Sequence, residues 1–227
     1  MSDASDDGGR VRRAVVAAFD VDGTLTSSDC VRPFLQRLGG RRGLALAVAR
    51  RPVATLSGLI RRDRDRLKEV LVGGVYRTRP VDDVRAAGRA FAGVIEASML
   101  RPDTLARLRW HQQEGHRTVI VSASLRAYLE PLAASLGIEH VLCTTLGVDS
   151  AGLFTGDASL CYGETKLARA TAWASEHGID LARSSFYTDS VSDLPVLNAV
   201  GEPRVINPDP RLRLRAALQG WPIDIWR

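Results

Sequence analysis

The feature that most constrains the fold of this chain is an alternation between short apolar runs and helical patterns. The predicted strands are 14–19, 117–122, 139–145, 184–189 and 203–207, and the predicted helices are 103–115, 125–137, 163–178, 193–201 and 210–219. This alternation is typical of a parallel sheet whose strands are joined by crossover helices. Residues 146–156 also predict a hairpin. We therefore expect an α/β protein.

Residues 30–98 interrupt the alternation, because they contain helical patterns and no convincing strand. The patterns are VRPFLQRLGG, GLALAVA, DRLKEVLVGGV and DDVRAAGRAFAGVIEAS. A helical block placed after the first strand reads as a separate cap on an α/β core. We expect a core domain of residues 14–29 and 99–227, a helical cap domain of residues 30–98, and a disordered tail of residues 1–13.

The net charge of +5 is unevenly distributed. From Cys30 to Leu100 the chain has 15 Lys and Arg against 6 Asp and Glu, whereas the remainder has 16 against 20. A solvated helical face explains this excess, and so does a surface that attracts anionic substrates or an anionic bilayer. The sequence has no helix-turn-helix, zinc-finger or aromatic-stacking pattern, so we expect no nucleic-acid partner.

Three features predict a cytoplasmic protein. The polar N-terminus lacks the apolar segment of a signal peptide, and the apolar stretch 44–60 is interrupted by the sequence RRP. The cysteines are widely spaced and form no C-x-x-C pair, which fits a reducing compartment. They are Cys30, Cys143 and Cys161.

The first predicted strand runs into FDVDGTLT, which places Asp20 and Asp22 where the strand ends. Side chains at positions i and i+2 of a strand point to the same side, and strand ends of this kind form the ligand edge of an open α/β sheet. Two carboxylates near a buried strand are costly unless a positive charge offsets them. Taken alone, the pattern is also explained by an Asp-Gly turn or a helix cap.

Other predicted strands bring polar groups to the same edge. Ser122, in VSAS, ends the second strand, where a hydroxyl beside a helix N-terminus forms an anion site or an N-cap. Lys166, in GETK, is one of two lysines beside 29 arginines, which indicates a compact ammonium or a chance surface lysine. Asp189 ends the fourth strand, and Asp193 follows as a further acid or a cap. Together these groups satisfy a hard divalent cation such as Mg²⁺ and a phosphate.

In this order, DVDGT, VSAS, the lysine of GETK and TDSVSD resemble the four motifs of the haloacid dehalogenase (HAD) superfamily of aspartate-nucleophile phosphatases. The resemblance covers about residues 14–227 and is closest to subfamily IB, the phosphoserine-phosphatase-like branch. It implies a Rossmann-like, HAD-type sheet core with an inserted α-helical cap. It also implies a Mg²⁺-dependent phosphomonoester hydrolase that acts through an aspartyl-phosphate.

The resemblance assigns roles to the acids of the first and fourth motifs. Asp20 is the implied nucleophile, and Asp22 is the implied general acid and base. The implied Mg²⁺ ligands are the carboxylates of Asp20 and Asp189 and the backbone carbonyl of Asp22.

Further roles follow for the residues around these acids. Ser122 and Lys166 are implied to bind the phosphoryl oxygens, and Thr24 to support the loop. Asp193 is implied to orient Lys166 or a metal-bound water.

Two positions depart from the branch. Asp29 stands where phosphoserine phosphatases have a glutamate that contacts the substrate amino group, and it is equally a candidate N-cap of the first cap helix. No arginine matches the one that binds the substrate carboxylate. Lys68 is the nearest candidate, with a surface role as its alternative.

We therefore expect a phosphatase that acts on a small phosphorylated metabolite, either phosphoserine-like or another small alcohol phosphate. One alternative is a phospholipid-headgroup or lysolipid phosphatase whose basic cap associates weakly with anionic membranes. Another is a phosphotransferase on the same fold. A catalytically silent binding protein is disfavoured by the complete set of motif residues. The sequence specifies no oligomeric state.

Overall fold

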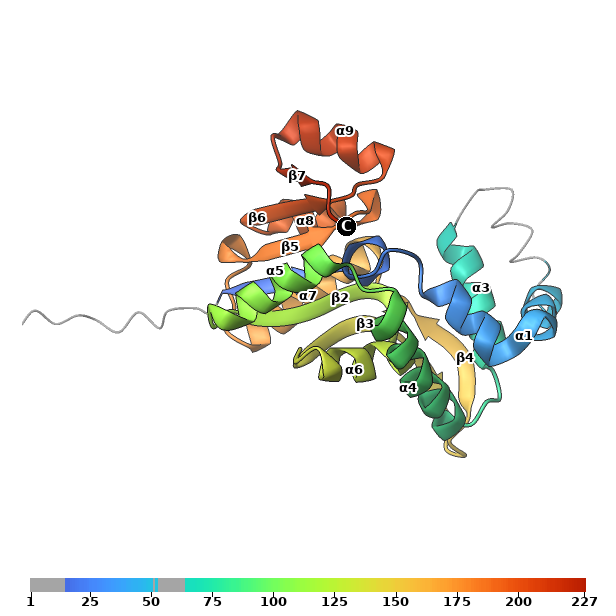
Figure 1. Cartoon of the computed structure of the whole chain (residues 1–227). Coiled ribbons are helices and arrows are strands. Elements are labelled where there is room, and N and C mark those ends of the chain that lie inside the picture. The colour runs from blue at the N-terminus through green and yellow to red at the C-terminus, as the bar shows by residue number, and fades with distance from the viewer. Residues whose placement is uncertain (1–14, 51, 53–63) are drawn as a thin grey trace, which may run out of the picture.

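The computed structural model describes residues 15–50, 52 and 64–227. Its core is a seven-stranded sheet in the order β4-β3-β2-β1-β5-β6-β7 (Figure 1). The strands are β1 (Val16–Phe19), β2 (Arg117–Leu125), β3 (His140–Val148), β4 (Phe154–Ser159), β5 (Ser185–Thr188), β6 (Glu202–Ile206) and β7 (Ile223–Asp224). Neighbouring strands are parallel except β3 and β4, which form an antiparallel hairpin. The predicted α/β fold is confirmed.

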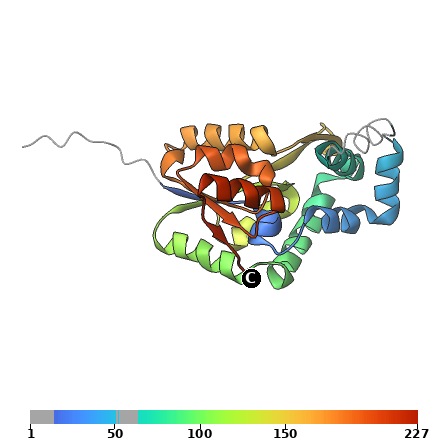
Figure 2. The ribbon, with the colours of Figure 1, turned by 90° about the horizontal axis from the view of Figure 1, so that it is seen from above.

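Helices cover both faces of the sheet because its central strands are apolar on both sides. In β1, Val16 and Ala18 belong to one apolar cluster, and Ala17 and Phe19 belong to another. Figure 2 shows helices on either side of the sheet, with α7 and α9 opposite α5. From residue 102 onward, the helices are α5 (Pro102–Gln113), α6 (Arg126–Ser135), α7 (Gly163–Glu176), α8 (Leu194–Ala199) and α9 (Pro210–Gln219). Burial on both faces is typical of parallel strands.

Between β1 and α5 the chain forms a helical insertion of α1 (Val31–Arg50), α3 (Arg64–Tyr76) and α4 (Val81–Ser98). Two of the expected helical patterns merge into α1, which has a non-helical backbone at Gly40. The two ends of the insertion lie side by side, since Thr26 and Leu100 form an antiparallel bridge. The helix α4 packs along α6 of the core, and α1 packs on α3 (Figure 1).

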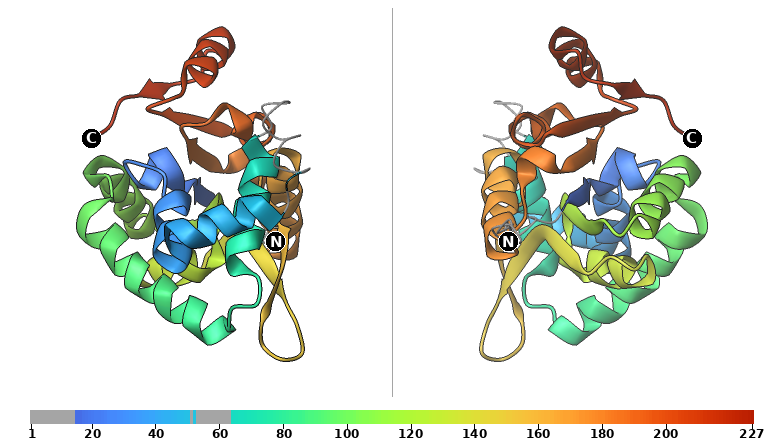
Figure 3. Two further views of the ribbon diagram at one scale, coloured as in Figure 1. Left: turned by 90° about the vertical axis from the view of Figure 1, so that its right-hand side faces the viewer. Right: turned by 90° about the vertical axis from the view of Figure 1, so that its left-hand side faces the viewer.

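The helix α3 also meets the β3–β4 hairpin (Figure 3). A Cβ atom added to Gly73 would lie 2.3 Å from the carbonyl oxygen of Gly156, so the two backbones are in direct contact. The hairpin touches the insertion a second time, where Pro80 and Leu153 form a bridge. The insertion is therefore held on the core through α4 and again through α3.

The structure differs from the predicted elements at several ends. The strand β2 continues to Leu125 with a register irregularity after Ser122, so the strand is longer than the predicted 117–122 and the next helix begins at Arg126. The short strand β7 was not predicted, because no apolar run in the sequence indicates it. The predicted tail 1–13 lies outside the described residues. None of the described helices combines the length and the apolar character that a membrane span requires.

Candidate active site

Asp20 lies directly after β1, at the centre of the sheet, where its backbone N–H donates to the carbonyl of Tyr187 on β5 (2.9 Å). The chain then turns through Val21–Leu25, with Gly23 at φ +81°. Asp20 is 6% exposed, so its carboxylate is held in the protein with little contact with water. Such a carboxylate requires a cation or hydrogen-bond donors close by.

Lys166, near the start of α7, supplies that cation. Its Nζ atom lies 3.2 Å from Oδ1 of Asp20 and 2.7 Å from Oδ2 of Asp193, and it is 1% exposed. The hydroxyl of Thr188 also donates to Oδ2 of Asp193 (2.7 Å). Burial lowers the pKa of Lys166, but the carboxylates of Asp193 and Asp20 outweigh it and raise the pKa overall. Lys166 is therefore a fixed ammonium shared by two buried acids.

Asp22 lies between the core and the first turn of α1. Its Oδ1 atom accepts from the backbone N–H of Cys30 (2.9 Å), and its Oδ2 atom accepts from the hydroxyl of Ser124 (2.6 Å). Burial and the nearby carboxylate of Asp29 raise the pKa of Asp22 to about 6, despite the opposing hydrogen bond from Ser124. A carboxyl group with this pKa is suited to give and take a proton near neutral pH.

Asp189 follows β5 and lies against the turn after β1. A Cβ atom added to Gly23 would stand 2.1 Å from Oδ2 of Asp189, so only glycine leaves room for this carboxylate. The hydroxyl of Thr24 donates to Oδ1 of Asp189 at 3.4 Å. Burial and then the carboxylate of Asp20 raise the pKa of Asp189 to about 7. The acids from the ends of β1 and β5 thus lie close enough to repel one another.

The remaining predicted residues have different surroundings. Ser122 is buried at the end of β2, and its hydroxyl accepts from the backbone N–H of Ser124 (3.2 Å). Asp29 caps α1, accepting from the backbone N–H groups of Val31 (3.3 Å) and Arg32 (3.0 Å). Lys68, on α3, lines a pocket together with Asp29. Two roles were predicted for Asp29, contact with a substrate amino group and N-cap of the first cap helix. The structure shows the N-cap hydrogen bonds.

Sequence reasoning assigned no role to three residues that hold the site together. Ser124 bonds Asp22 from the irregular end of β2, where regular strand alternation gives no signal. Thr188 bonds Asp193 from the end of β5. Arg101 donates from Nε to the carbonyls of Gly23 (3.2 Å) and Thr26 (3.3 Å). No local pattern reveals Arg101, because its partners lie far back along the chain.

The donor atoms at this edge fit a hard divalent cation. The ammonium of Lys166 pairs with Asp20 and Asp193, and no ion pair to Asp22 or Asp189 occurs in the described part of the chain. Within the same residues, no three side chains from His, Cys, Asp and Glu form a ready-made metal cluster. The predicted Mg²⁺ ligands differ from such a cluster, because they are two carboxylates and a backbone carbonyl. Oxygen donors of these kinds suit Mg²⁺.

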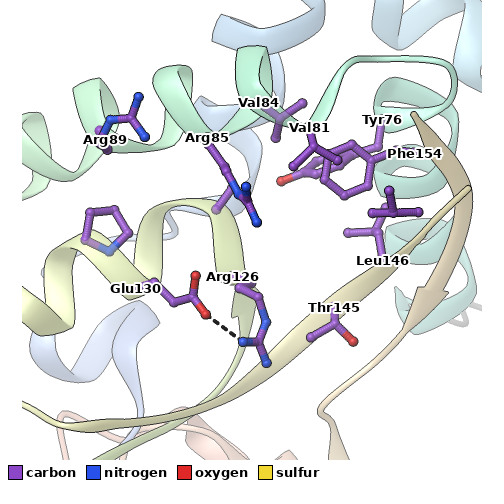
Figure 4. Close-up of a pocket in the computed structure, with 13 residues that line it drawn as sticks. Tyr76, Val81, Val84, Arg85, Arg89, Arg126, Glu130, Thr145, Leu146 and Phe154 are labelled. Carbon is purple, nitrogen blue, oxygen red and sulfur yellow. Dashed lines mark hydrogen bonds and ion pairs between the residues drawn. The ribbon is translucent and has the colours of Figure 1, made fainter. Parts of the chain in front are cut away.

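A pocket of about 340 Å³ lies apart from these acids, between α4, α6 and the hairpin (Figure 4). Arg85, Arg89 and Arg126 line one part of it, and Arg126 pairs with Glu130 (2.6 Å). Apolar side chains such as Phe154 line the rest. None of the predicted site residues lines this pocket, so it is separate from the acid cluster.

Replacement of Gly23 by Ala is expected to destabilise the protein, because Asp189 occupies the space that a side chain would need. In Gly23→Ala the new methyl group collides with Asp189, and the residue must also keep a positive φ, which costs about 1–2 kcal/mol by itself. Chemical denaturation should show a larger loss of unfolding free energy than that. Gly152→Ala is the matched control, since Gly152 has φ +75° and no atom within 4 Å of the added Cβ. Equal losses for the two variants would contradict the close approach of Asp189.

A mostly parallel sheet with acids gathered at the carboxyl ends of its central strands, and with a helical insertion after the first strand, is typical of a class of α/β enzymes. The family model that matches this chain describes haloacid dehalogenase-like hydrolases and covers residues 17–198. The chain therefore belongs to the haloacid dehalogenase-like hydrolase family. The predicted family and the prediction of an enzyme of the hydrolase class are confirmed.

Individual relatives agree with this family. A probable phosphatase from Mycobacterium tuberculosis (strain H37Rv) is 32% identical over 223 residues, which span 95% of this chain and 77% of that protein. A Bordetella pertussis protein of unknown function has a TM-score of 0.77 at 26% identity, covering 93% of this chain and 98% of its own. A phosphoserine phosphatase, solved as a phospho-aspartyl intermediate analogue, shares the fold with a TM-score of 0.64 at 16% identity, covering 94% of each chain.

Proposed function

We propose that this protein is a Mg²⁺-dependent phosphatase that hydrolyses a phosphomonoester of a small alcohol through an aspartyl-phosphate on Asp20. The observation that carries the proposal is the ion-pair network at the sheet edge, in which Lys166 Nζ lies 3.2 Å from Asp20 and 2.7 Å from Asp193. A carboxylate held this way has a defined direction of approach to a substrate. The name of the mycobacterial relative, a probable phosphatase, supports the same chemistry.

The proposed reaction uses the chain's own groups in two steps. Asp20 attacks phosphorus, forming the Asp20–phosphorus bond as the bond to the alcohol breaks, and Asp22 gives its proton to the leaving oxygen. Asp22 then takes a proton from the water that hydrolyses the acyl phosphate. The pKa of about 6 at Asp22, from burial and Asp29, supports both transfers.

Other residues bind and position in this proposal. Ser122 and Lys166 bind the phosphoryl oxygens, and Asp193 orients Lys166. Thr24 supports Asp189 in the turn. The carboxylates of Asp20 and Asp189 and the backbone carbonyl of Asp22 would hold Mg²⁺, whose charge neutralises the developing negative charge on the phosphoryl group.

Domain division, location and partners belong to the same proposal. We assign residues 14–29 and 99–227 to the core and 30–98 to a cap over the acids, since the linkers pair at Thr26 and Leu100. The cysteines of the described residues, Cys30, Cys143 and Cys161, are free and buried, which supports a reducing compartment such as the cytoplasm. Attachment of the basic cap to anionic membranes, with no nucleic-acid partner, stays a prediction.

Removal of the metal is the direct test of the proposed chemistry. Purified protein treated with EDTA should lose p-nitrophenyl phosphate hydrolysis by at least about 100-fold, because the remaining acids repel the substrate, and Mg²⁺ should restore it. Mass spectrometry after rapid acid quenching should detect a phosphoryl adduct on the peptide that contains Asp20. Full activity in EDTA, or an adduct on another residue, would refute the proposal.

A further inference from the structure

A second pocket, of about 660 Å³, lies between α1 and α3 in the helical insertion. Its volume is within the usual range for sites that bind small molecules. The side chains that give it its character are aliphatic: Val31, Leu35, Leu44, Leu67 and Leu71. Among the described residues, the charged side chains that line it are Asp29, Arg32 and Lys68. We call this space the cap pocket.

The cap pocket begins next to the proposed general acid. The backbone N–H of Cys30 donates to Asp22 Oδ1 at 2.9 Å, and the two neighbours of Cys30, Asp29 and Val31, both line the pocket. The charges of Asp29 and Lys68 also act on the Asp22 carboxyl group, in opposite directions. An alcohol whose oxygen takes a proton from Asp22 would therefore have residues that line this pocket as near neighbours.

The described lining selects against an alcohol that carries an ammonium. An amino-acid leaving group would place its ammonium among aliphatic side chains, and burying a charge without a partner is strongly unfavourable. Asp29, the carboxylate that the described residues contribute to the lining, already accepts from two backbone N–H groups at the start of α1. Lys68 and Arg32 add positive charge, which repels an ammonium.

We infer that the substrate is a phosphate monoester of an alcohol with an apolar chain or ring system, which binds in the cap pocket with its ester oxygen at Asp22. This inference rests on the proposed function and narrows its substrate class. Hydrolysis releases the apolar alcohol with the proton from Asp22, and water returns the phosphoryl group as inorganic phosphate. Burial of the apolar group supplies binding energy that a short alcohol lacks.

A series of ethyl, butyl, hexyl and octyl phosphates, used below their micelle concentrations with Mg²⁺, tests the inference. The value of kcat/KM should rise by about fourfold for each added methylene until the pocket is filled. Phosphoserine should be a poorer substrate than butyl phosphate. A flat series, or phosphoserine hydrolysed as efficiently as octyl phosphate, would overturn the inference while leaving the proposed phosphatase intact.

A matched pair of variants locates the effect. Leu44→Gln places an amide in the cap pocket and should lower the octyl-to-ethyl ratio of kcat/KM about tenfold. Leu214→Gln makes the same change on α9, where Leu214 is 65% exposed, and should leave the ratio unchanged. Equal octyl-to-ethyl ratios in the two variants would show that the alkyl group of the substrate binds outside the cap pocket.

Binding of phosphonates, which are not hydrolysed, tests the apolar cap pocket separately from the proposed phosphatase activity. Calorimetry with ethylphosphonate and octylphosphonate, in the presence of Mg²⁺, should give at least tenfold tighter binding of the octyl compound. If no phosphate ester is hydrolysed, the proposed function is wrong. In that case a preference for octylphosphonate still supports the apolar cap pocket, and equal binding of both compounds overturns it.

Discussion

Replacement of Asp20 by Asn should reduce phosphate-ester turnover by about 10⁴-fold or more, because the amide offers no nucleophilic oxygen for phosphorus. The fold should persist, since Asn fills the same volume and its carbonyl oxygen still accepts from Lys166 Nζ. The change also removes one of the carboxylates that repel Asp189. Initial rates with p-nitrophenyl phosphate, together with urea unfolding of the same preparation, measure both effects.

The control for Asp20→Asn is the same substitution at an exposed acid. Asp157 lies on β4 at the surface, and Asp157→Asn should keep wild-type rates. Fresh preparations with no other phosphatase present are required, because the expected residual rate is low. An Asp20→Asn protein that retains a tenth of the wild-type rate would remove Asp20 from the role of nucleophile.

Replacement of Lys166 by Met is expected to damage both folding and activity. The methionine side chain has a similar length but no charge, so the buried carboxylates of Asp20 and Asp193 lose their shared counterion. Breaking a buried pair from one side typically costs about 3–5 kcal/mol. Urea unfolding should report a loss of that order, and turnover should fall by at least about 10³-fold with the phosphoryl-binding ammonium gone.

A second variant separates the structural part of that loss from the catalytic part. In Lys166→Met with Asp193→Asn, the acid 2.7 Å from the ammonium is neutral, so part of the lost unfolding free energy should return. Turnover should not return, because Asn restores no positive charge near Asp20. Additive stability losses in the double variant would contradict a direct pair between Lys166 and Asp193.

The sequence predicted the parts of the fold that depend on local pattern. Short continuous apolar runs and helical runs with glycine ends locate the strands and helices of the core to within a few residues. The end of β2 was misjudged, because the serines of VSAS suit a helix start as well as a strand end, and pairing with β3 draws Leu125 into the sheet. The strand β7 has only two residues and is defined by its neighbour β6.

The candidate site was predictable as a set of residues, but its partners were not. Acids at the ends of parallel strands meet at one edge, which is why Asp20 and Asp189 were expected to lie close together, as they do. The bond from Ser124 to Asp22 depends on the irregular end of β2, and Arg101 reaches Gly23 from the far linker of the insertion. The cap pocket arises from packing of α1 on α3, which no motif encodes.

The contact between Gly73 and Gly156 has a mechanical consequence. Two backbones that touch with no side chain between them leave no compressible layer, so α3 and β4 respond to a force as a single piece. If α1 and α3 swing away from Asp22 to admit a bulky alcohol, the antiparallel edge of the sheet must bend with them.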